Sequence, residues 1–137
     1  THRHLRDVIP SFCSLGSVLA TIYTDAIEPK KVGPAAMQFA HDAIDRIMEY
    51  RDKIDQARHI DVNYAKLVAD PVGNVRAIYD KFGYEFTAEF EERLRRFMAE
   101  KSANRPKHVY SMEQFNLDGA TIDREFAAYH EKFGLEN

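Results

Sequence analysis

The segment Thr1–Ser11 concentrates side chains that could hold a phosphate. Arg3 and Arg6 stand with two histidines just ahead of a predicted helix start at Asp7. The first N–H groups of a helix lack internal partners and its N-terminus carries partial positive charge, so an anion there meets donors already aimed outward. Ser11 is expected one turn into the helix, ~6 Å along the axis from Asp7. The arginine and the hydroxyl could therefore grip one phosphate from two sides.

The spacing of this segment resembles a known family. An arginine, a short stretch ending Arg-Asp-Val and a serine eight positions after the arginine are similar to the 3′-phosphate segment of the sulfotransferases, matched by Arg3 and Ser11. The resemblance implies that both residues bind the 3′-phosphate of the donor 3′-phosphoadenosine 5′-phosphosulfate and of its product, adenosine 3′,5′-bisphosphate. Relatives usually carry an acidic residue or Asn and then Pro after the arginine. This chain has His4 and Leu5 there, which changes the turn but keeps both phosphate ligands.

Two further stretches carry the same resemblance. Residues 62–71 are similar to the family's strand, its Tyr-x-x-Leu pattern and its Asp-Pro helix start, which implies an adenine contact for Tyr64. From the residues alone, a core tyrosine whose hydroxyl reaches water is an equal alternative. Residues 104–111 resemble a basic loop that covers the nucleotide in bacterial-type relatives, which implies phosphate contacts for Arg105 and Lys107.

The resemblance covers the whole chain but only the back half of a family member. We expect residues 1–137 to be the C-terminal part of a single sulfotransferase domain, with a P-loop-like α/β fold when intact and its phosphosulfate-loop half absent. That loop, the usual catalytic base and a lysine precede the arginine in the family, and no Gly-x-x-x-x-Gly-Lys run occurs here. No catalytic residue is therefore assigned, and the chain alone is expected to be inactive in sulfuryl transfer to an acceptor hydroxyl or amine.

The elements that must position these residues are mainly helices, with one or two short strands. Apolar residues recurring three and four apart, with capping signals at the ends, predict the helices. They are expected at about 8–22, 34–53, 71–82, from 87 to a loop at 102–110, and at 121–133, with a strand at 59–64. Cys13 lies close to the apolar face of the first helix and is expected to be buried.

The composition of the chain argues against some classes of binding partner. The net charge of −3 and the isoelectric point near 6.0 give no broad basic field, which argues against nucleic acid and anionic membranes. A single cysteine cannot form an internal disulfide, so a reducing, cytoplasmic location is expected. No apolar run is long enough to span a bilayer.

Metal and triad chemistry have weak support in the sequence. His2 and His4 are two apart and would share one face of a strand, but no third ligand of a fitting type stands near them. The other four histidines have no serine, cysteine or acid at triad-like spacing. We therefore expect no metal and no catalytic histidine.

Two other functions remain open from the residues. Amphipathic helices with aromatic stripes also suit a non-enzymatic helical interaction domain. A phosphate-loop kinase relative would share the architecture but would not need an arginine and a serine devoted to a 3′-phosphate. A chain lacking half its sheet would expose an edge and apolar surface, so homo-oligomers are possible.

Overall fold

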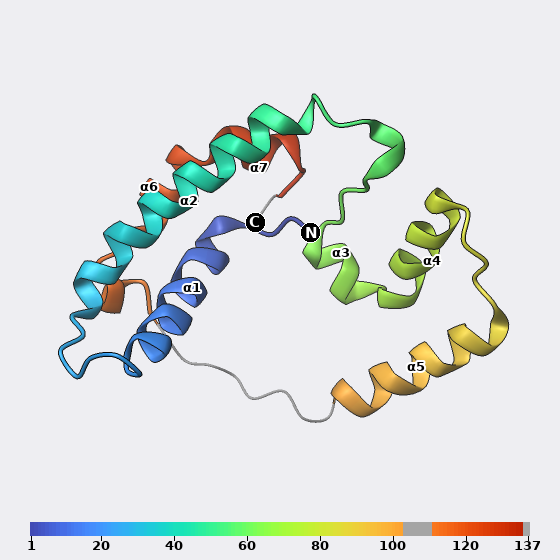
Figure 1. Ribbon diagram of the computed structural model, residues 1–137, viewed down its shortest axis with the longest axis horizontal. Helices are drawn as coiled ribbons and strands as arrows, with labels where there is room; N and C mark the ends of the chain where they lie inside the picture. The colour runs from blue at the N-terminus through green and yellow to red at the C-terminus, as the bar shows by residue number, and fades with distance from the viewer. Residues whose placement is uncertain (103–110, 136–137) are drawn as a thin grey trace. The chain divides into compact units, whose positions relative to one another are not determined.

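The protein is described by a computed structural model over residues 1–102 and 111–135, which form two compact units (Figure 1). Among these residues, unit 1 contains 1–2 and 54–102, and unit 2 contains 3–53 and 111–135. Both units are helical. The described residues contain no β-strand, only one isolated parallel bridge between His2 and Asn63, so the expected short strands are reduced to a single pairing.

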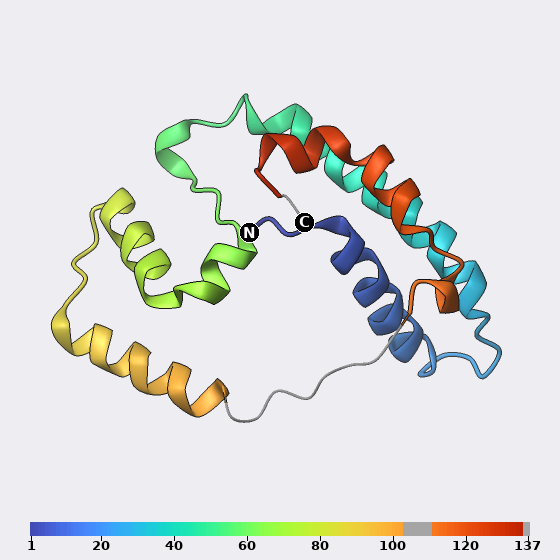
Figure 2. The same cartoon turned by 180° about the vertical axis from the view of Figure 1, so that it is seen from behind.

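Unit 2 packs two long helices against a helical C-terminal segment. Its elements are α1 (Leu5–Ala20), α2 (Pro29–Arg51), the 3₁₀ turn η2 (Glu113–Phe115), α6 (Gly119–Glu125) and α7 (Ala127–Lys132). Figures 1 and 2 show α6 and α7 running along α2. The core joins all of these elements and consists of Leu5, Ile9, Cys13, Ala36, Phe115, Leu117, Ile122, Phe126, Tyr129 and Leu135.

The start of α1 differs from the sequence prediction. The helix begins at Leu5 and is capped by His4, whose ring accepts the Arg6 N–H, whereas Asp7 lies inside the first turn. A carboxylate is stabilised by the partial positive charge anywhere in that turn, so Asp7 marks the helix start without being its cap. Leu5 and Cys13, on the side facing the core, are buried, which confirms the expectation for the cysteine.

A second face of α1 is apolar and exposed. Phe12, Leu15 and Leu19, from the series that predicted the helix, are between 44% and 56% exposed, and Ile22, in the loop after α1, is 71% exposed. Phe39 of α2 stacks on Phe12 with ring centroids 5.2 Å apart and is itself exposed. The periodic signal therefore predicted the helix correctly, but the burial in this chain is on the neighbouring face.

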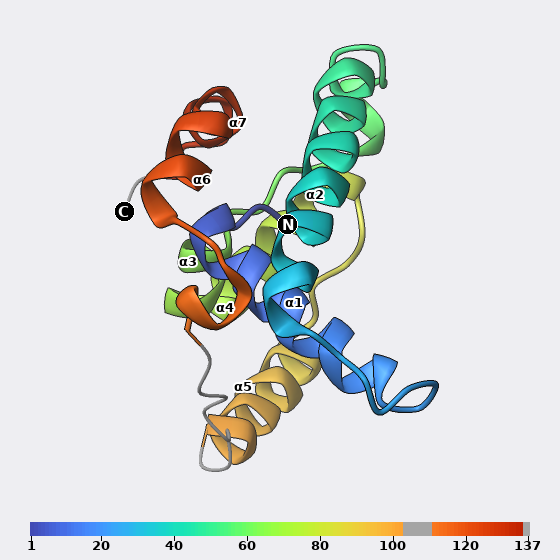
Figure 3. The ribbon, with the colours of Figure 1, turned by 90° about the vertical axis from the view of Figure 1, so that its left-hand side faces the viewer.

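The other boundaries in unit 2 shift in ways that local chemistry explains. Residues 21–28 form the loop after α1, which projects from the end of that helix (Figure 3). α2 begins at Pro29, five residues before the predicted Pro34, because proline is also favoured at the first helical position. The predicted last helix is two helices, since it breaks at Phe126 with φ −108° and ψ 18°.

Unit 1 holds η1 (Gln56–Arg58), α3 (Tyr64–Ala69), α4 (Pro71–Phe82) and α5 (Ala88–Ser102). The strand predicted at 59–64 is wrong. The Asn63 side chain accepts the N–H groups of Ala65 and Lys66 and so starts α3, and only the main-chain bridge remains. In that bridge the His2 N–H donates to Val62 O, and the Tyr64 N–H donates to His2 O, both at 2.8 Å.

The limits of α4 and the start of α5 confirm the sequence predictions. Asp70 Oδ1 accepts the Gly73 N–H at 2.9 Å, and Gly83 ends α4 at φ 69°, a conformation that costs glycine little. The Thr87 hydroxyl accepts the Phe90 N–H at 3.1 Å at the start of α5. Among the described residues of unit 1, Val72 is the only buried hydrophobic one. None of the helices described is both long and apolar enough to cross a membrane.

Substitution of Gly33 would test how closely α2 packs against η2 in unit 2. A Cβ on Gly33, in α2, would lie 1.8 Å from the main-chain oxygen of Phe115, whereas a Cβ on Gly16, in α1, would meet nothing within 4 Å. Gly33→Ala should lower the free energy of unfolding by about 1–3 kcal/mol or more, because backbone must move. Gly16→Ala should raise it by up to about 1 kcal/mol through helix propensity. Urea unfolding of both variants measures this, and equal effects would refute the close approach of α2 to η2.

Candidate functional site

Arg3 lies against the first turn of α1. Its Nε and Nη2 atoms donate to Asp7 Oδ2 at 3.3 and 3.2 Å. Both side chains are well exposed, at 39% and 57%. An exposed pair of this kind contributes little to stability. The guanidinium is therefore placed by Asp7 while remaining accessible to a ligand.

Ser11 lies on the same face of α1 as Asp7. The two residues are four apart in a continuous helix, so they are neighbours on one side, ~6 Å apart along the axis. Because Arg3 contacts Asp7, the guanidinium lies on the side of the helix where residue Ser11 is placed. Ser11 is nevertheless ~9 Å along the axis from Leu5, farther from the helix start than the sequence predicted.

The N–H groups at the start of α1 are not aimed at an open site, which corrects the sequence prediction. Leu5 donates to His130 Nε2 at 3.1 Å, and Arg6 donates to His4 Nδ1 at 3.3 Å. The Asp7 N–H donates to His4 O at 3.0 Å. Any anion bound on this face would thus depend on the side chains of Arg3 and Ser11.

Arg6 serves a different partner. Its guanidinium makes a two-pronged contact with the Asp123 carboxylate of α6, with Nε and Oδ1 3.1 Å apart and Nη2 bonded to Oδ2. Two parallel hydrogen bonds fix the orientation of both groups. Of the two arginines in the segment, Arg3 is the one placed on the side of Ser11.

The three other predicted site residues lie outside the part of unit 2 described above. Tyr64 belongs to unit 1, where it is half-buried and begins α3. Its N–H donates to the carbonyl of His2, the residue before Arg3 in the chain. Arg105 and Lys107 lie outside the described residues, so their phosphate contacts stay predictions from the resemblance.

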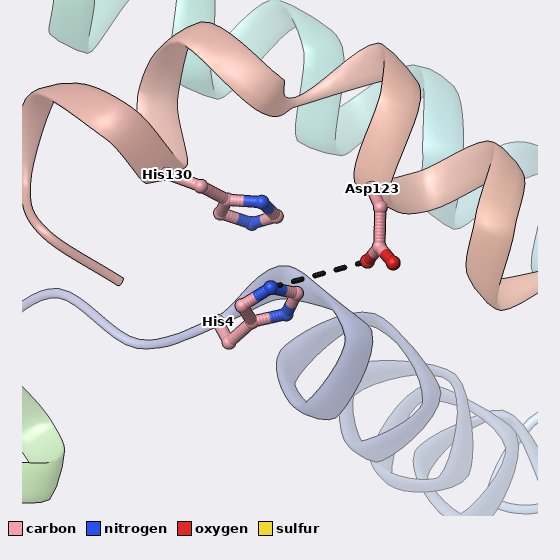
Figure 4. Close-up of side chains that lie close together, drawn as sticks. All are labelled: His4, Asp123 and His130. Atoms are coloured by element: carbon pink, nitrogen blue, oxygen red, sulfur yellow. Dashed lines mark ion pairs between the residues drawn. The ribbon is translucent and has the colours of Figure 1, made fainter. Parts of the chain in front are cut away.

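A cluster that the sequence did not reveal lies where α1 begins. His4, Asp123 and His130 each place a potential ligand atom within 4.8 Å of the others (Figure 4). The rings of His4 and His130 stack with centroids 3.9 Å apart and planes 25° from parallel. His4 Nε2 faces Asp123 Oδ1 at 3.9 Å. We call these three residues the His–Asp–His cluster.

The geometry of the His–Asp–His cluster fits a hydrogen-bond network better than a metal centre. Imidazole lone pairs lie in the ring plane, so two nearly parallel stacked rings do not aim them at one point. One nitrogen of each ring already accepts a main-chain N–H, from Leu5 for His130 and from Arg6 for His4. Asp123 is engaged by the Arg6 guanidinium. A metal would have to break all of these contacts.

Burial gives His130 an unusual titration. Loss of solvent lowers the pKa of this imidazole below its ordinary value of 6.5, and the nearby His4 lowers it further. The Asp123 carboxylate opposes this, and Arg6 lowers the pKa slightly. The neutral ring is also the form that can accept the Leu5 N–H, because a protonated imidazole has no acceptor.

One sequence signal could have identified His130. It stands four residues after Phe126 and next to Tyr129, within the apolar stripe predicted for the last helix. A histidine on a buried stripe needs a polar partner, which points to a long-range hydrogen bond. Its partner, the Leu5 N–H, lies 125 positions away in the sequence. Asp123 and Leu5 could not have been paired with it from local spacing.

Stability should therefore depend on pH through His130. The pKa is lower in the folded chain than the 6.5 expected when unfolded, so the unfolded state binds the proton first as pH falls. The contribution of neutral His130 is complete above about pH 6.5 and is lost as pH falls through the folded pKa. Urea unfolding at pH 7.5 and 5.5 should show a larger loss for the wild type than for His130→Gln.

His41→Gln is the matched control, because His41 pairs with Glu125 and stacks on Phe126 without touching the start of α1. It should lose stability with falling pH as the wild type does. Parallel pH curves for the wild type and His130→Gln would show that the buried ring does not titrate as inferred.

Comparison with known proteins gives a consistent result. A family model described as the sulfotransferase family matches residues 1–88 of the 137. The crystal structure of sulfotransferase STF9 from Mycobacterium avium is similar over 98% of this chain, with a TM-score of 0.84 and 25% identity. That of sulfotransferase STF1 from Mycobacterium tuberculosis H37Rv is similar over 93%, with a TM-score of 0.73 and 29% identity. No curated protein matches the sequence.

This chain matches only part of each of the two solved structures. This chain covers 35% of the STF9 chain and 32% of the STF1 chain, about a third of each. The family model, by contrast, spans more than half of this chain and includes the segment from Arg3 to Ser11 and the Tyr64 stretch. The chain therefore belongs to the sulfotransferase family.

Proposed function

We propose that this chain supplies the 3′-phosphate part of the nucleotide site of a sulfotransferase. The donor is 3′-phosphoadenosine 5′-phosphosulfate, and the product that remains bound is adenosine 3′,5′-bisphosphate. Arg3 and Ser11 hold the 3′-phosphate, Tyr64 contacts the adenine, and Arg105 and Lys107 contribute phosphate contacts. Membership of the family supports this assignment, together with the motif spacing at each position.

One observation carries the proposal. The Arg3 guanidinium is held at Asp7, and Asp7 is one helical turn before Ser11 on the same face of α1. A phosphate on that face can accept from the guanidinium and from the hydroxyl at once. Because the main-chain N–H groups of the first turn are already used, these two side chains supply the specificity for a phosphate at the 3′ position.

The reaction would transfer a sulfuryl group to an acceptor hydroxyl or amine. The acceptor oxygen or nitrogen bonds to sulfur, the bond from sulfur to the 5′-phosphate oxygen breaks, and a base takes the acceptor proton. The described residues of this chain have no assigned role in that step. Their part is to orient the donor, and orientation of a bound reactant can lower a barrier substantially.

We further propose that residues 1–137 are the C-terminal part of one sulfotransferase domain. The relatives are about three times as long as the part this chain covers. Phe12, Leu15 and Leu19 of α1, with Ile22 just after the helix, form an exposed apolar surface of the kind that another part of a domain covers. Without it, self-association is an expected consequence. The buried single cysteine fits a cytoplasmic protein.

Nucleotide binding tests the site. Calorimetry should show that the chain binds adenosine 3′,5′-bisphosphate more tightly than AMP, which lacks the 3′-phosphate. Arg3→Ala should weaken the bisphosphate at least about tenfold, since a charge-assisted contact contributes roughly 1.5–3 kcal/mol. Ser11→Ala should weaken it by about three- to tenfold, as loss of a neutral hydrogen bond does.

Arg46→Ala is the control for a general loss of positive charge, because Arg46 is exposed on α2, away from the segment. Its affinities should match those of the wild type. Equal affinity of the wild type for the two nucleotides would overturn the proposed site.

A separate test asks whether the exposed apolar face of α1 is a surface that another part of a domain covers. The chain should bind a hydrophobic dye and associate with itself as concentration rises, because its apolar face lacks a cover. Leu15→Gln with Leu19→Gln should reduce both signals, as measured by dye fluorescence and sedimentation velocity. Val68→Gln, a change at a single exposed position of α3, should leave both unchanged. A monomeric chain that binds no dye would argue against a missing cover.

A further inference from the structure

The start of α1 is tied to the C-terminal helices at three consecutive residues. His4 stacks on the ring of His130, as Figure 4 shows. The Leu5 N–H donates to His130 Nε2, and the Arg6 guanidinium donates two hydrogen bonds to the Asp123 carboxylate. The Leu5 contact is buried, since His130 is only 8% exposed. Three successive contacts fix both the position and the rotation of the main chain at this point.

The residues so fixed lie between the two proposed phosphate ligands. Arg3 immediately precedes the anchored residues, and Asp7, which places the Arg3 guanidinium, immediately follows them. A shift of the main chain at Leu5 would move Arg3 relative to Ser11. Small displacements of groups that hold a reactant can cost large factors in function.

We propose that His130 is a positioning residue for the nucleotide site, holding Arg3 in register with Ser11 through the Leu5 N–H. The inference rests on the proposed function of Arg3 and Ser11, which it deepens. Asp123 acts in the same network through Arg6. His130 is a group that touches no ligand and acts only through the segment it anchors.

The hydrogen bond to His130 depends on which residue stands at position 5. Leucine keeps its main-chain N–H, whereas a proline at that position would have none to donate. The N–H that leucine retains at position 5 is the one that His130 accepts. The histidine and the non-proline residue therefore belong together.

The network also makes the site sensitive to acid. Only neutral His130 can accept the Leu5 N–H. Protonation would place a cation beside His4 and Arg6, with Asp123 as the opposing anion among the described residues. The anchor should therefore loosen as the pH falls through the folded pKa of His130, which lies below the ordinary 6.5. The preference for a 3′-phosphate should weaken with it.

His130→Leu and His130→Gln separate positioning from mere packing. Leucine fills the space without an acceptor, while glutamine retains a side-chain oxygen that can accept and does not titrate. We expect His130→Leu to bind adenosine 3′,5′-bisphosphate at least tenfold more weakly, with AMP affinity changed less than twofold. His130→Gln should stay within threefold of the wild type. His41→Leu, in which a second histidine of unit 2 is removed, should match the wild type for both nucleotides.

A pH series on the wild type keeps the test decisive if His130→Leu does not fold. The ratio of the two affinities should fall from pH 7.5 to 5.5 more steeply in the wild type than in His130→Gln. The comparison is needed because phosphate monoesters themselves titrate near pH 6. Identical slopes would refute the acid sensitivity of the anchor, and a folded His130→Leu with wild-type affinity would overturn the positioning role.

Amide hydrogen exchange distinguishes failure of this inference from failure of the nucleotide site. The Leu5 amide should lose protection in His130→Leu and retain it in His41→Leu. Unchanged protection at Leu5 overturns the positioning role, whatever the nucleotide data show. Lost protection in a chain that does not distinguish the two nucleotides would refute the phosphate site while supporting the anchor.

Discussion

The hydrogen bond from the Leu5 N–H to His130 Nε2 is the constraint on which the described site depends. It joins the first residue of α1 to α7, across 125 positions of sequence, inside the core of unit 2. A buried main-chain donor without a partner costs roughly 1–3 kcal/mol, so the pairing is strongly favoured. Once the main chain is fixed at Leu5, the main-chain positions of Arg3 and Asp7 on either side of it are restricted too. In the positioning role that we propose for His130, a core histidine decides the position of a surface arginine.

The local parts of this arrangement could be predicted from the sequence, because they depend on neighbours in the chain. Asp70-Pro71 and Gly83 gave the limits of α4, and the serine eight positions after Arg3 gave the family. The cap of α1 was missed because histidine is an uncommon cap and Asp7 lies in a position that also favours an acid.

The remaining differences have a tertiary origin. The stretch at 59–64 has the alternation of a strand, but a strand needs partners, and the described residues offer it only His2. Asn63 then favours the helix that it caps. Likewise, the apolar series on α1 identified a helix without saying which apolar face this chain would bury. The His–Asp–His cluster brings together residues from both ends of the chain, which no local pattern encodes.

The use of the first-turn N–H groups has a consequence for how an anion is recognised. A helix N-terminus with open N–H groups attracts any anion, because main-chain donors are alike from one protein to another. Here those donors are satisfied by His4 and His130, so the site we propose relies on one guanidinium and one hydroxyl whose separation is set by the helix. Such a site would select among anions by the distance between its two side chains more than by charge. That distance has to be held fixed for the selection to work. The buried hydrogen bond at Leu5 is proposed to supply that rigidity. The same contact therefore satisfies a first-turn N–H group and fixes the segment that carries Arg3.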